Sequence, residues 1–246
     1  GQKEGMASVG TRRDEVLIVD KAVFCSELRQ LMSGYAKLSP KTFFDLVHVA
    51  YEKALNNSEK DTIFYHIHNP SPYAKLNFLR YNPEAKLLMM VREPIQSCES
   101  WIRKVINESS ENTHSRIVTM LFDIDQIVFR RQDSIGVRLE DLKKYPKETM
   151  AALCDWMGVK EAPSLYEMTA QGKKWWGDPT SPDYGKEAMT PFGDSAIKRP
   201  VGSIFSEQDQ FILGVLFYPF RVRFGYVEAN DDQFKKDLQT IKPLLD

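Results

Sequence analysis

Four short apolar segments, separated by longer helical patterns, are the feature that most constrains the fold of this chain. They lie at residues 15–20, 62–68, 85–91 and 135–140 and are rich in aliphatic or aromatic residues. Strands that alternate with helices are typical of a parallel sheet with helices on its faces. We therefore predict an α/β fold, with a parallel sheet flanked by helices.

Proline and capping residues predict helix boundaries along the chain. The expected helices begin at Ser39–Pro40, near Pro94 (ending by Ser109), at about Ser115 (ending near Arg131), at Pro146 (ending at Gly158) and at Ser206 (ended or kinked by Pro219). A charged helical tail is expected to close the chain.

Length and charge narrow the class of protein. The chain has 246 residues, and its 33 Lys and Arg against 34 Asp and Glu leave a net charge of -1. This balance gives no general attraction for nucleic acid or for an anionic membrane. No apolar run approaches the roughly 20 residues that span a bilayer, and the first residues lack the apolar stretch of a signal peptide. We expect a cytoplasmic protein with a single domain over residues 1–246, because no linker or repeat divides it.

The cysteines and histidines do not form a metal-binding pattern. Cys25, Cys98 and Cys154 are odd in number and show no CxxC spacing, which indicates buried thiols in a reducing compartment. The four histidines include no HExxH motif and no neighbouring cysteine at zinc-ligand spacing. We expect no metal cofactor.

Residues 172–202 differ from the rest of the chain because glycine and proline recur there in close order. Long segments of this kind are typically functional lids or disordered. The aromatic pair Trp175 and Trp176 favours a lid, in which these two side chains would contact an acceptor substrate.

The segment from residue 85 to residue 100 carries the densest chemical signal. An apolar strand runs into Arg92, Pro94 opens a helix, and Ser100 follows in its second turn. A strand that leads into a helix N-terminus presents free backbone N–H groups, and arginine adds a fork that suits phosphate. The sequence thus predicts a phosphate site, with an ordinary strand–helix junction and a surface arginine as the alternative.

This segment resembles the 3′-phosphate motif of sulfotransferases that use 3′-phosphoadenosine 5′-phosphosulfate. In that family an apolar strand ends in Arg, Pro often follows two residues later and Ser comes eight residues after the Arg, as Arg92, Pro94 and Ser100 do here. Residues 136–146 and 153–158 are similar to a later strand, acidic pair and helix of the family. Lys198, Arg199 and Gly202 resemble its basic loop, which closes on the same phosphate. The resemblance implies a P-loop-kinase-like sulfotransferase fold.

The resemblance also assigns a catalytic base. The family has a Lys-x-His-x-Pro run one strand earlier, and the matching residues here are His66, His68 and Pro70. His68 would then take the proton of the acceptor hydroxyl, as a neutral imidazole can near pH 7. His66 stands where the family has lysine, and alternation puts it on the same strand face. The alternative is a pair of strand histidines held by hydrogen bonds alone.

Two positions depart from the family pattern. The family begins with a strand and a Gly-x-Pro-x-Ser-Gly-Thr loop for the 5′-phosphosulfate, whereas residues 5–11 follow no predicted strand and contain no basic residue. The simplest interpretation is that the sequence given starts after such a loop. Leu139 stands where cytosolic members carry a tyrosine against the adenine, which leaves Trp175 or Trp176 to stack on the base.

Together these features predict a sulfotransferase that moves a sulfuryl group to a hydroxyl or amine of a small-molecule or glycan acceptor. A non-catalytic nucleotide-binding or interaction module that lacks the sulfuryl half is the alternative. A nucleotide kinase of related fold is disfavoured, because the GxxxxGK[ST] motif is absent from the sequence.

Overall fold

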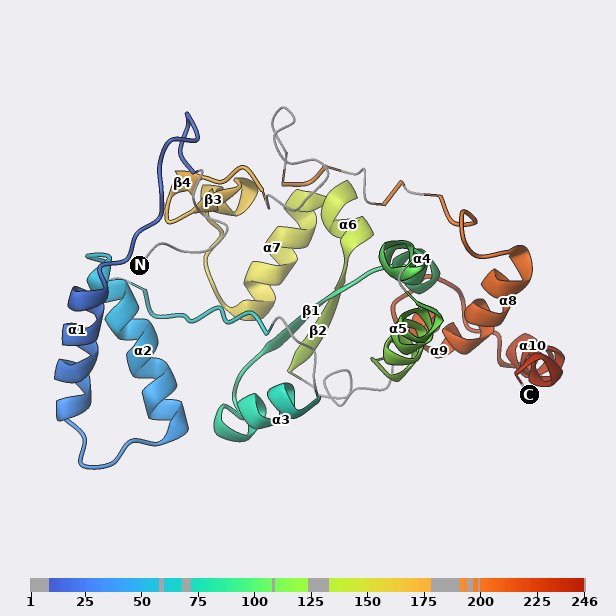
Figure 1. Cartoon of the computed structure of the whole chain (residues 1–246), viewed down its shortest axis with the longest axis horizontal. Helices are drawn as coiled ribbons and strands as arrows, with labels where there is room; N and C mark the ends of the chain where they lie inside the picture. Colours follow the sequence, from blue (N-terminus) through green and yellow to red (C-terminus); the bar gives the residue numbers. More distant parts are fainter. Residues whose placement is uncertain are drawn as a thin grey trace. The chain divides into compact units, whose positions relative to one another are not determined.

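The computed structural model describes residues 9–57, 60–67, 72–107, 109–123, 133–177, 191–193, 197–198 and 200–245. It is a mixed α/β structure in which helices predominate (Figure 1). The chain forms two compact units: unit 1 comprises residues 1–85 and 160–191, and unit 2 comprises residues 86–159 and 192–246. The single domain expected over residues 1–246 stays a prediction.

Unit 2 contains a parallel pair of strands, β1 (Leu87–Val91) and β2 (Ser134–Arg138). Their register runs from Leu87 opposite Ser134 to Val91 opposite Arg138. Two of the four predicted strands, and their parallel pairing, are thereby confirmed. The second ends two residues earlier than predicted, because helix α6 (Leu139–Lys144) begins directly after it.

Seven helices of unit 2 lie in its described residues, and most begin at a capping residue or a proline. They are α4 (Pro94–Val105), α5 (Ser110–Asp123), α6, α7 (Pro146–Met157), α8 (Glu207–Leu216), α9 (Tyr218–Arg223) and α10 (Asp231–Ile241). A short 3-10 turn, η3 (Lys242–Leu244), follows α10.

The local signals at these helix ends act as predicted. Ser206 and Asp209 form a reciprocal capping box at α8. Gly158 ends α7 in the left-handed conformation, with φ at 74°. Helix α5 starts five residues before the predicted position, because the Ser109 hydroxyl accepts a hydrogen bond from the Asn112 amide at 3.1 Å.

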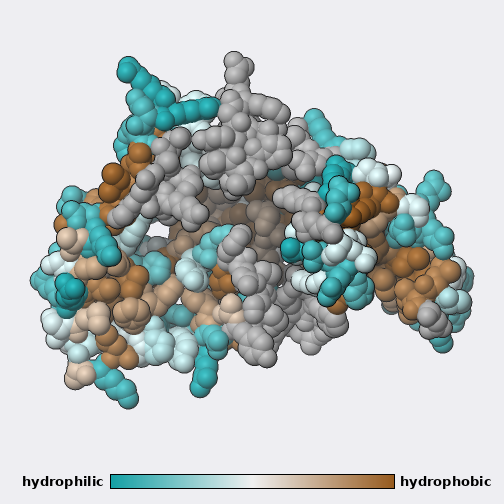
Figure 2. Space-filling view, viewed as in Figure 1, coloured by the Kyte–Doolittle hydropathy of each residue, from teal (hydrophilic) through white to brown (hydrophobic). Residues whose placement is uncertain are grey.

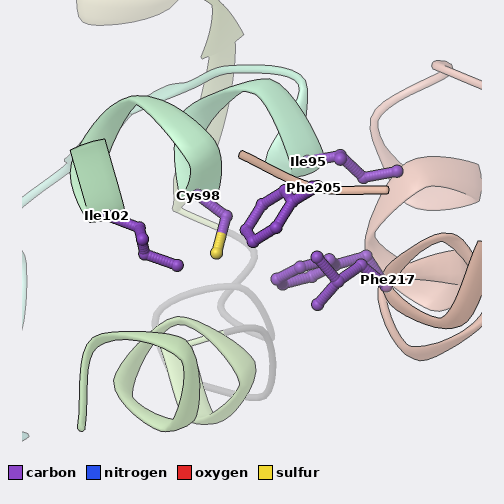
Figure 3. Close-up of a cluster of buried hydrophobic side chains, with 6 residues drawn as sticks. Ile95, Cys98, Ile102, Phe205 and Phe217 are labelled. Carbon is purple, nitrogen blue, oxygen red and sulfur yellow. The ribbon is translucent and has the colours of Figure 1, made fainter. Parts of the chain in front are cut away.

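A cluster of buried side chains joins α4 to α8 and to the segment before it. Ile95, Cys98 and Ile102 recur at helical spacing on one face of α4 and contact Phe205 and Phe217 (Figure 3). Cys98 is completely buried and Ile102 is 1% exposed. This cluster fixes the face of α4 that turns toward the core, and with it the face that is left for polar contacts.

Unit 1 contains a pair of contacting helices, α1 (Lys21–Ser33) and α2 (Pro40–Ala54), followed by α3 (Pro72–Tyr81). Ser39 caps α2 as predicted, because its hydroxyl accepts from the Thr42 amide at 3.0 Å. Val23, Phe43 and Val49 of the α1–α2 pair are exposed apolar side chains. Hydrophobic and hydrophilic areas alternate on the face of this part of the molecule that Figure 2 shows.

A small antiparallel arrangement completes the described part of unit 1. The 3-10 turn η2 (Pro163–Tyr166) leads into strands β3 (Thr169–Ala170) and β4 (Lys173–Lys174), which pair with each other. Val9 forms single bridges to Glu15 on one side and to Trp175 on the other. The N-terminal residues of the described chain are therefore tied to the end of β4.

The two other predicted strands are wrong in the described part of the chain. Residues 16–20 form no regular ladder, and the Asp20 carboxylate caps α1 by accepting from the amides of Ala22 and Val23 at 2.8 and 3.1 Å. Residues 62–67 form no strand, and the Tyr65 ring lies against the rings of Phe44 and Phe78. Apolar pattern alone does not make a strand, because a strand also needs a partner ladder.

Candidate functional site

The carboxyl ends of β1 and β2 bring two polar segments together in unit 2. Val91, the last residue of β1, lies opposite Arg138, the last residue of β2, so the segments that follow the two strands begin side by side. The Glu93 amide donates to Oε1 of Glu140 at 3.0 Å, and the Tyr226 hydroxyl donates to Oε2 of the same carboxylate at 2.9 Å. Ligands of parallel sheets bind at this edge, which makes it the candidate site.

Arg138 and Tyr226 are held in place by this network. Arg138 donates to both carboxylate oxygens of Asp141, at 2.6 and 2.7 Å, and to the Gly225 carbonyl at 2.9 Å. The bond to Asp141 raises the pKa of Arg138. Burial, followed by the hydrogen bond to Glu140, raises the pKa of Tyr226. The hydrogen bonds of Arg138 and Tyr226 thus hold the segments that follow β1 and β2 in place.

An internal carboxylate caps the helix N-terminus at which we predicted a phosphate. Glu93 Oε2 accepts from the Gln96 amide at 2.8 Å, and Glu93 Oε1 lies 3.2 Å from Nε of Arg221. Pro94 has no N–H to offer. In the first turn of α4, the Gln96 amide is therefore already bonded to Glu93.

Arg92 is linked to the basic loop through Gln96. Arg92 Nε donates to Gln96 Oε1 at 3.0 Å, and Gln96 Nε2 donates to the Ile197 carbonyl at 3.1 Å. Lys198 follows Ile197 directly and is exposed. The structure thus brings Arg92 and the start of the basic loop to the same end of α4.

Glu99 binds the other end of the basic loop. Its carboxylate is 2% exposed and accepts from the amides of Gly202 and Ser203 at 2.8 and 3.0 Å. Burial alone would raise the pKa of Glu99, but hydrogen bonds from the Ser203 hydroxyl and from the backbone amides of Gly202, Ser203 and Phe205 outweigh it and lower the pKa to about 2. Glu99 is therefore ionised at neutral pH.

The other residues that were predicted to bind the phosphate are Ser100, Arg199 and Gly202. Ser100 lies on α4, four residues after Gln96, and is half-buried. Arg199 lies outside the described residues. Gly202, which the resemblance places in the phosphate-binding loop, donates its amide hydrogen to Glu99 in this structure.

The predicted catalytic residues belong to unit 1. His66 is exposed and lies in the irregular segment 60–67, and His68 lies outside the described residues. The strand that was expected to carry both histidines is not formed by residues 62–67.

Trp175 and Trp176 lie at the end of β4, in contact with the N-terminal segment. Trp176 Nε1 donates to the Gly10 carbonyl at 2.7 Å. The Arg13 guanidinium and the Lys174 ammonium lie 4.0 and 3.9 Å from the centre of the Trp176 ring. Trp176, in the predicted lid of residues 172–202, is thus held by specific contacts. Residues 178–190, 194–196 and 199 of that range lie outside the description, so the lid stays a prediction.

All three cysteines lie in the described part of the chain and are free thiols. Cys98 and Cys154 are buried free thiols as predicted, whereas Cys25 is only half-buried. Among the described side chains, no group of three His, Cys, Asp or Glu residues is arranged to hold a metal ion. Within the same residues, none of the helices combines the length and the apolar character needed to cross a membrane.

Sequence reasoning missed the two residues that organise this site, Gln96 and Glu99. For Glu99 the available signal was its position directly after Cys98 and three residues before Ile102, on the apolar side of a predicted helix. It indicates a carboxylate near the core, which needs internal donors.

Comparison of the chain with protein-family models, with curated proteins and with solved structures finds no match. The assignment of a function therefore depends on the residues and their geometry.

Proposed function

We propose that the edge of unit 2 formed by Arg92, α4 and the 197–203 segment binds the 3′-phosphate of an adenosine nucleotide. The chain would be a sulfotransferase that uses 3′-phosphoadenosine 5′-phosphosulfate and releases adenosine 3′,5′-bisphosphate. One observation carries the proposal. Gln96, which binds Arg92, also binds Ile197, 101 positions further along the chain.

This contact supports the proposal because the resemblance assigns Arg92 and the basic loop to one phosphate, and Gln96 connects Arg92 to the residue before Lys198. Arginine offers a phosphate a rigid fork and lysine a point charge, and Lys198 directly follows the Ile197 that Gln96 binds. The site lies at the carboxyl edge of a parallel strand pair, where nucleotides bind in α/β proteins. A P-loop-like sulfotransferase fold is part of the proposal.

The chemical step of the proposal is a direct displacement at sulfur. The acceptor oxygen or nitrogen forms a bond to sulfur, the bond from sulfur to the 5′-phosphate oxygen breaks, and the nucleotide leaves as the bisphosphate. His68 takes the acceptor proton, with His66 beside it in sequence. Positioned cations and N–H groups supply most of the rate in such a step, because charge spreads over the sulfuryl oxygens.

Calorimetric titration tests the binding half of the proposal. Wild type and Arg92→Ala are titrated with adenosine 3′,5′-bisphosphate and with adenosine 5′-monophosphate, which lacks the 3′-phosphate. Loss of one charge-assisted contact weakens binding of the bisphosphate about ten- to a hundredfold. The monophosphate should bind equally to both proteins, because it does not reach Arg92.

Arg29→Ala is the matched control, since Arg29 is an exposed arginine of α1 in unit 1. It should bind both nucleotides as wild type does. Equal affinity of wild type and Arg92→Ala for the bisphosphate, or equal loss for both nucleotides, would remove Arg92 from a 3′-phosphate site.

A second candidate is a nucleotide-binding module without transferase activity. It is supported by the backbone of Gly10, whose polar groups are bonded to other residues of unit 1. The Gly10 amide donates to the Lys174 carbonyl at 2.8 Å, and the Gly10 carbonyl accepts from Trp176. Those groups are then not directed at a phosphosulfate. Transfer of labelled sulfate to phenols, sugars and amines, compared between wild type and His68→Ala, separates the candidates. Turnover that His68→Ala abolishes supports the enzyme, and no turnover with intact nucleotide binding supports the module.

A further inference from the structure

The carboxylate of Glu99 is surrounded by hydrogen-bond donors. Oε2 accepts from the Gly202 amide, and Oε1 accepts from the amide and the hydroxyl of Ser203. Arg103 Nη2 lies 3.3 Å from Oε1 and also donates to Ser203 Oγ. Ser203 Oγ accepts a hydrogen bond from Arg103 and donates its own hydrogen to Glu99.

This environment selects a carboxylate and excludes an amide. A glutamine at position 99 would place its NH₂ group against Gly202 N–H or against the Ser203 donors, whichever way the amide is turned. A buried carboxylate in turn is tolerated only where such donors compensate for its lost hydration. Glu99 and the 202–203 turn therefore depend on each other.

The backbone of the turn is shaped for an anion. Gly202 has φ at 107°, which L side chains rarely adopt, and this conformation lets successive amides at 202 and 203 converge on one group. Converging successive amides form an anion-binding concavity in many proteins. Here the anion in that concavity is a side chain of the same chain.

We infer that Glu99 is a built-in anion that fills the 202–203 concavity and fixes the basic loop on α4. It is a positioning residue. Gln96 holds Ile197 and Glu99 holds Gly202, three residues apart on α4, so both ends of the loop are attached to one helix face. Under the proposed function, on which this consequence rests, Lys198 serves the phosphate while the Gly202 amide does not.

Hydrogen exchange tests the built-in anion without any nucleotide. The amides of Gly202 and Ser203 should exchange at least about tenfold faster in Glu99→Gln than in wild type, because a charge-assisted bond is lost. In Glu99→Ala the same increase should be reversed by added formate, which can occupy the vacated position. Chloride at equal ionic strength should not reverse it.

Two further variants serve as comparisons in the exchange experiment. Glu228→Gln removes an exposed carboxylate from a loop and should leave exchange at 202–203 unchanged. Ser203→Ala removes one donor but leaves both amides on Glu99, so its effect on the Gly202 amide should be smaller than that of Glu99→Gln. Unchanged exchange in Glu99→Gln, or no specific effect of formate, would overturn the inference.

Nucleotide binding then separates the two proposals. If wild type binds adenosine 3′,5′-bisphosphate, Glu99→Gln should bind it about tenfold more weakly, and formate should restore the affinity of Glu99→Ala. Affinity in Glu99→Gln equal to wild type would overturn the positioning role. Failure of wild type to bind the bisphosphate would remove the proposed function, while the exchange result would still decide whether Glu99 fills the concavity.

Discussion

Gly136 lies in the middle of β2, and the ring of Phe224 occupies the space that a side chain there would need. A Cβ placed on Gly136 would lie 2.2 Å from Cε1 of Phe224 and 3.0 Å from both Cδ1 and Cζ. Gly136→Ala therefore requires the ring edge to retreat by about 1.2 Å to reach an ordinary contact of 3.4 Å. Forcing one carbon into packed side chains typically costs about 1–3 kcal/mol. We expect Gly136→Ala to lower the free energy of unfolding by that amount.

Urea unfolding monitored by circular dichroism measures this change, with Phe224→Leu and the double variant completing a thermodynamic cycle. Leucine is shorter than phenylalanine, so Gly136→Ala should cost less in the Phe224→Leu background. Gly34→Ala is the control, because the nearest atom to its added Cβ is the Leu31 carbonyl oxygen at 3.7 Å. It should change stability by no more than about 1 kcal/mol in either direction. Additive effects in the cycle, or a Gly136→Ala protein as stable as wild type, would refute the steric argument.

Three further results are expected. Glu99 has its pKa at about 2 in the folded protein against 4.5 ordinarily, so it contributes about 3 kcal/mol at neutral pH that is lost as pH falls from about 4.5 to 2. Urea unfolding should therefore show the stability gap between wild type and Glu99→Gln narrowing on acidification, and a constant gap would contradict this. Burial raises the pKa of the Cys98 thiol to about 12, so mass spectrometry after iodoacetamide treatment should find native protein labelled at Cys25 well before Cys98, with the difference abolished in urea. Tyr226→Phe removes the bond to Glu140 and should lower the free energy of unfolding by about 1–2 kcal/mol, measured by urea titration, whereas an unchanged midpoint would show that water replaces the hydroxyl.

Four helix boundaries were predictable from sequence because their signals are local, whereas α1 and α3 were not predicted and α5 begins five residues before its predicted start. Ser39, Pro94, Gly158 and Ser206 act within one helical turn of the position they determine. Strand β1 was predictable because all five of its residues are apolar, and β2 because Ile135 and Val137 alternate with smaller or polar residues. Residues 16–20 and 62–67 have similar composition, but a strand depends on a partner elsewhere in the chain, which composition does not reveal.

Some residues of the candidate site could likewise be predicted from the sequence, and others could not. Arg92 and the 198–202 loop carry recognisable local patterns, so they could be chosen from sequence. The partners of the loop could not, because Glu99 and Gly202 are 103 positions apart. A glycine suited to an anion gives no indication of whether that anion is a ligand or a glutamate of the same chain.

The division of the chain into two interleaved units affects the order in which it can fold during synthesis. Unit 1 needs residues 160–191 in addition to its N-terminal part, and unit 2 needs residues 192–246. The ribosome delivers the N-terminal part first, and domains generally fold as units when their residues have emerged. Unit 1 lacks its second part until residues 160–191 have been synthesised, and β1, β2 and α4 of unit 2 are all synthesised before α8. The nascent chain would expose the apolar face of α4 during this interval, which is when a chaperone has the most to bind.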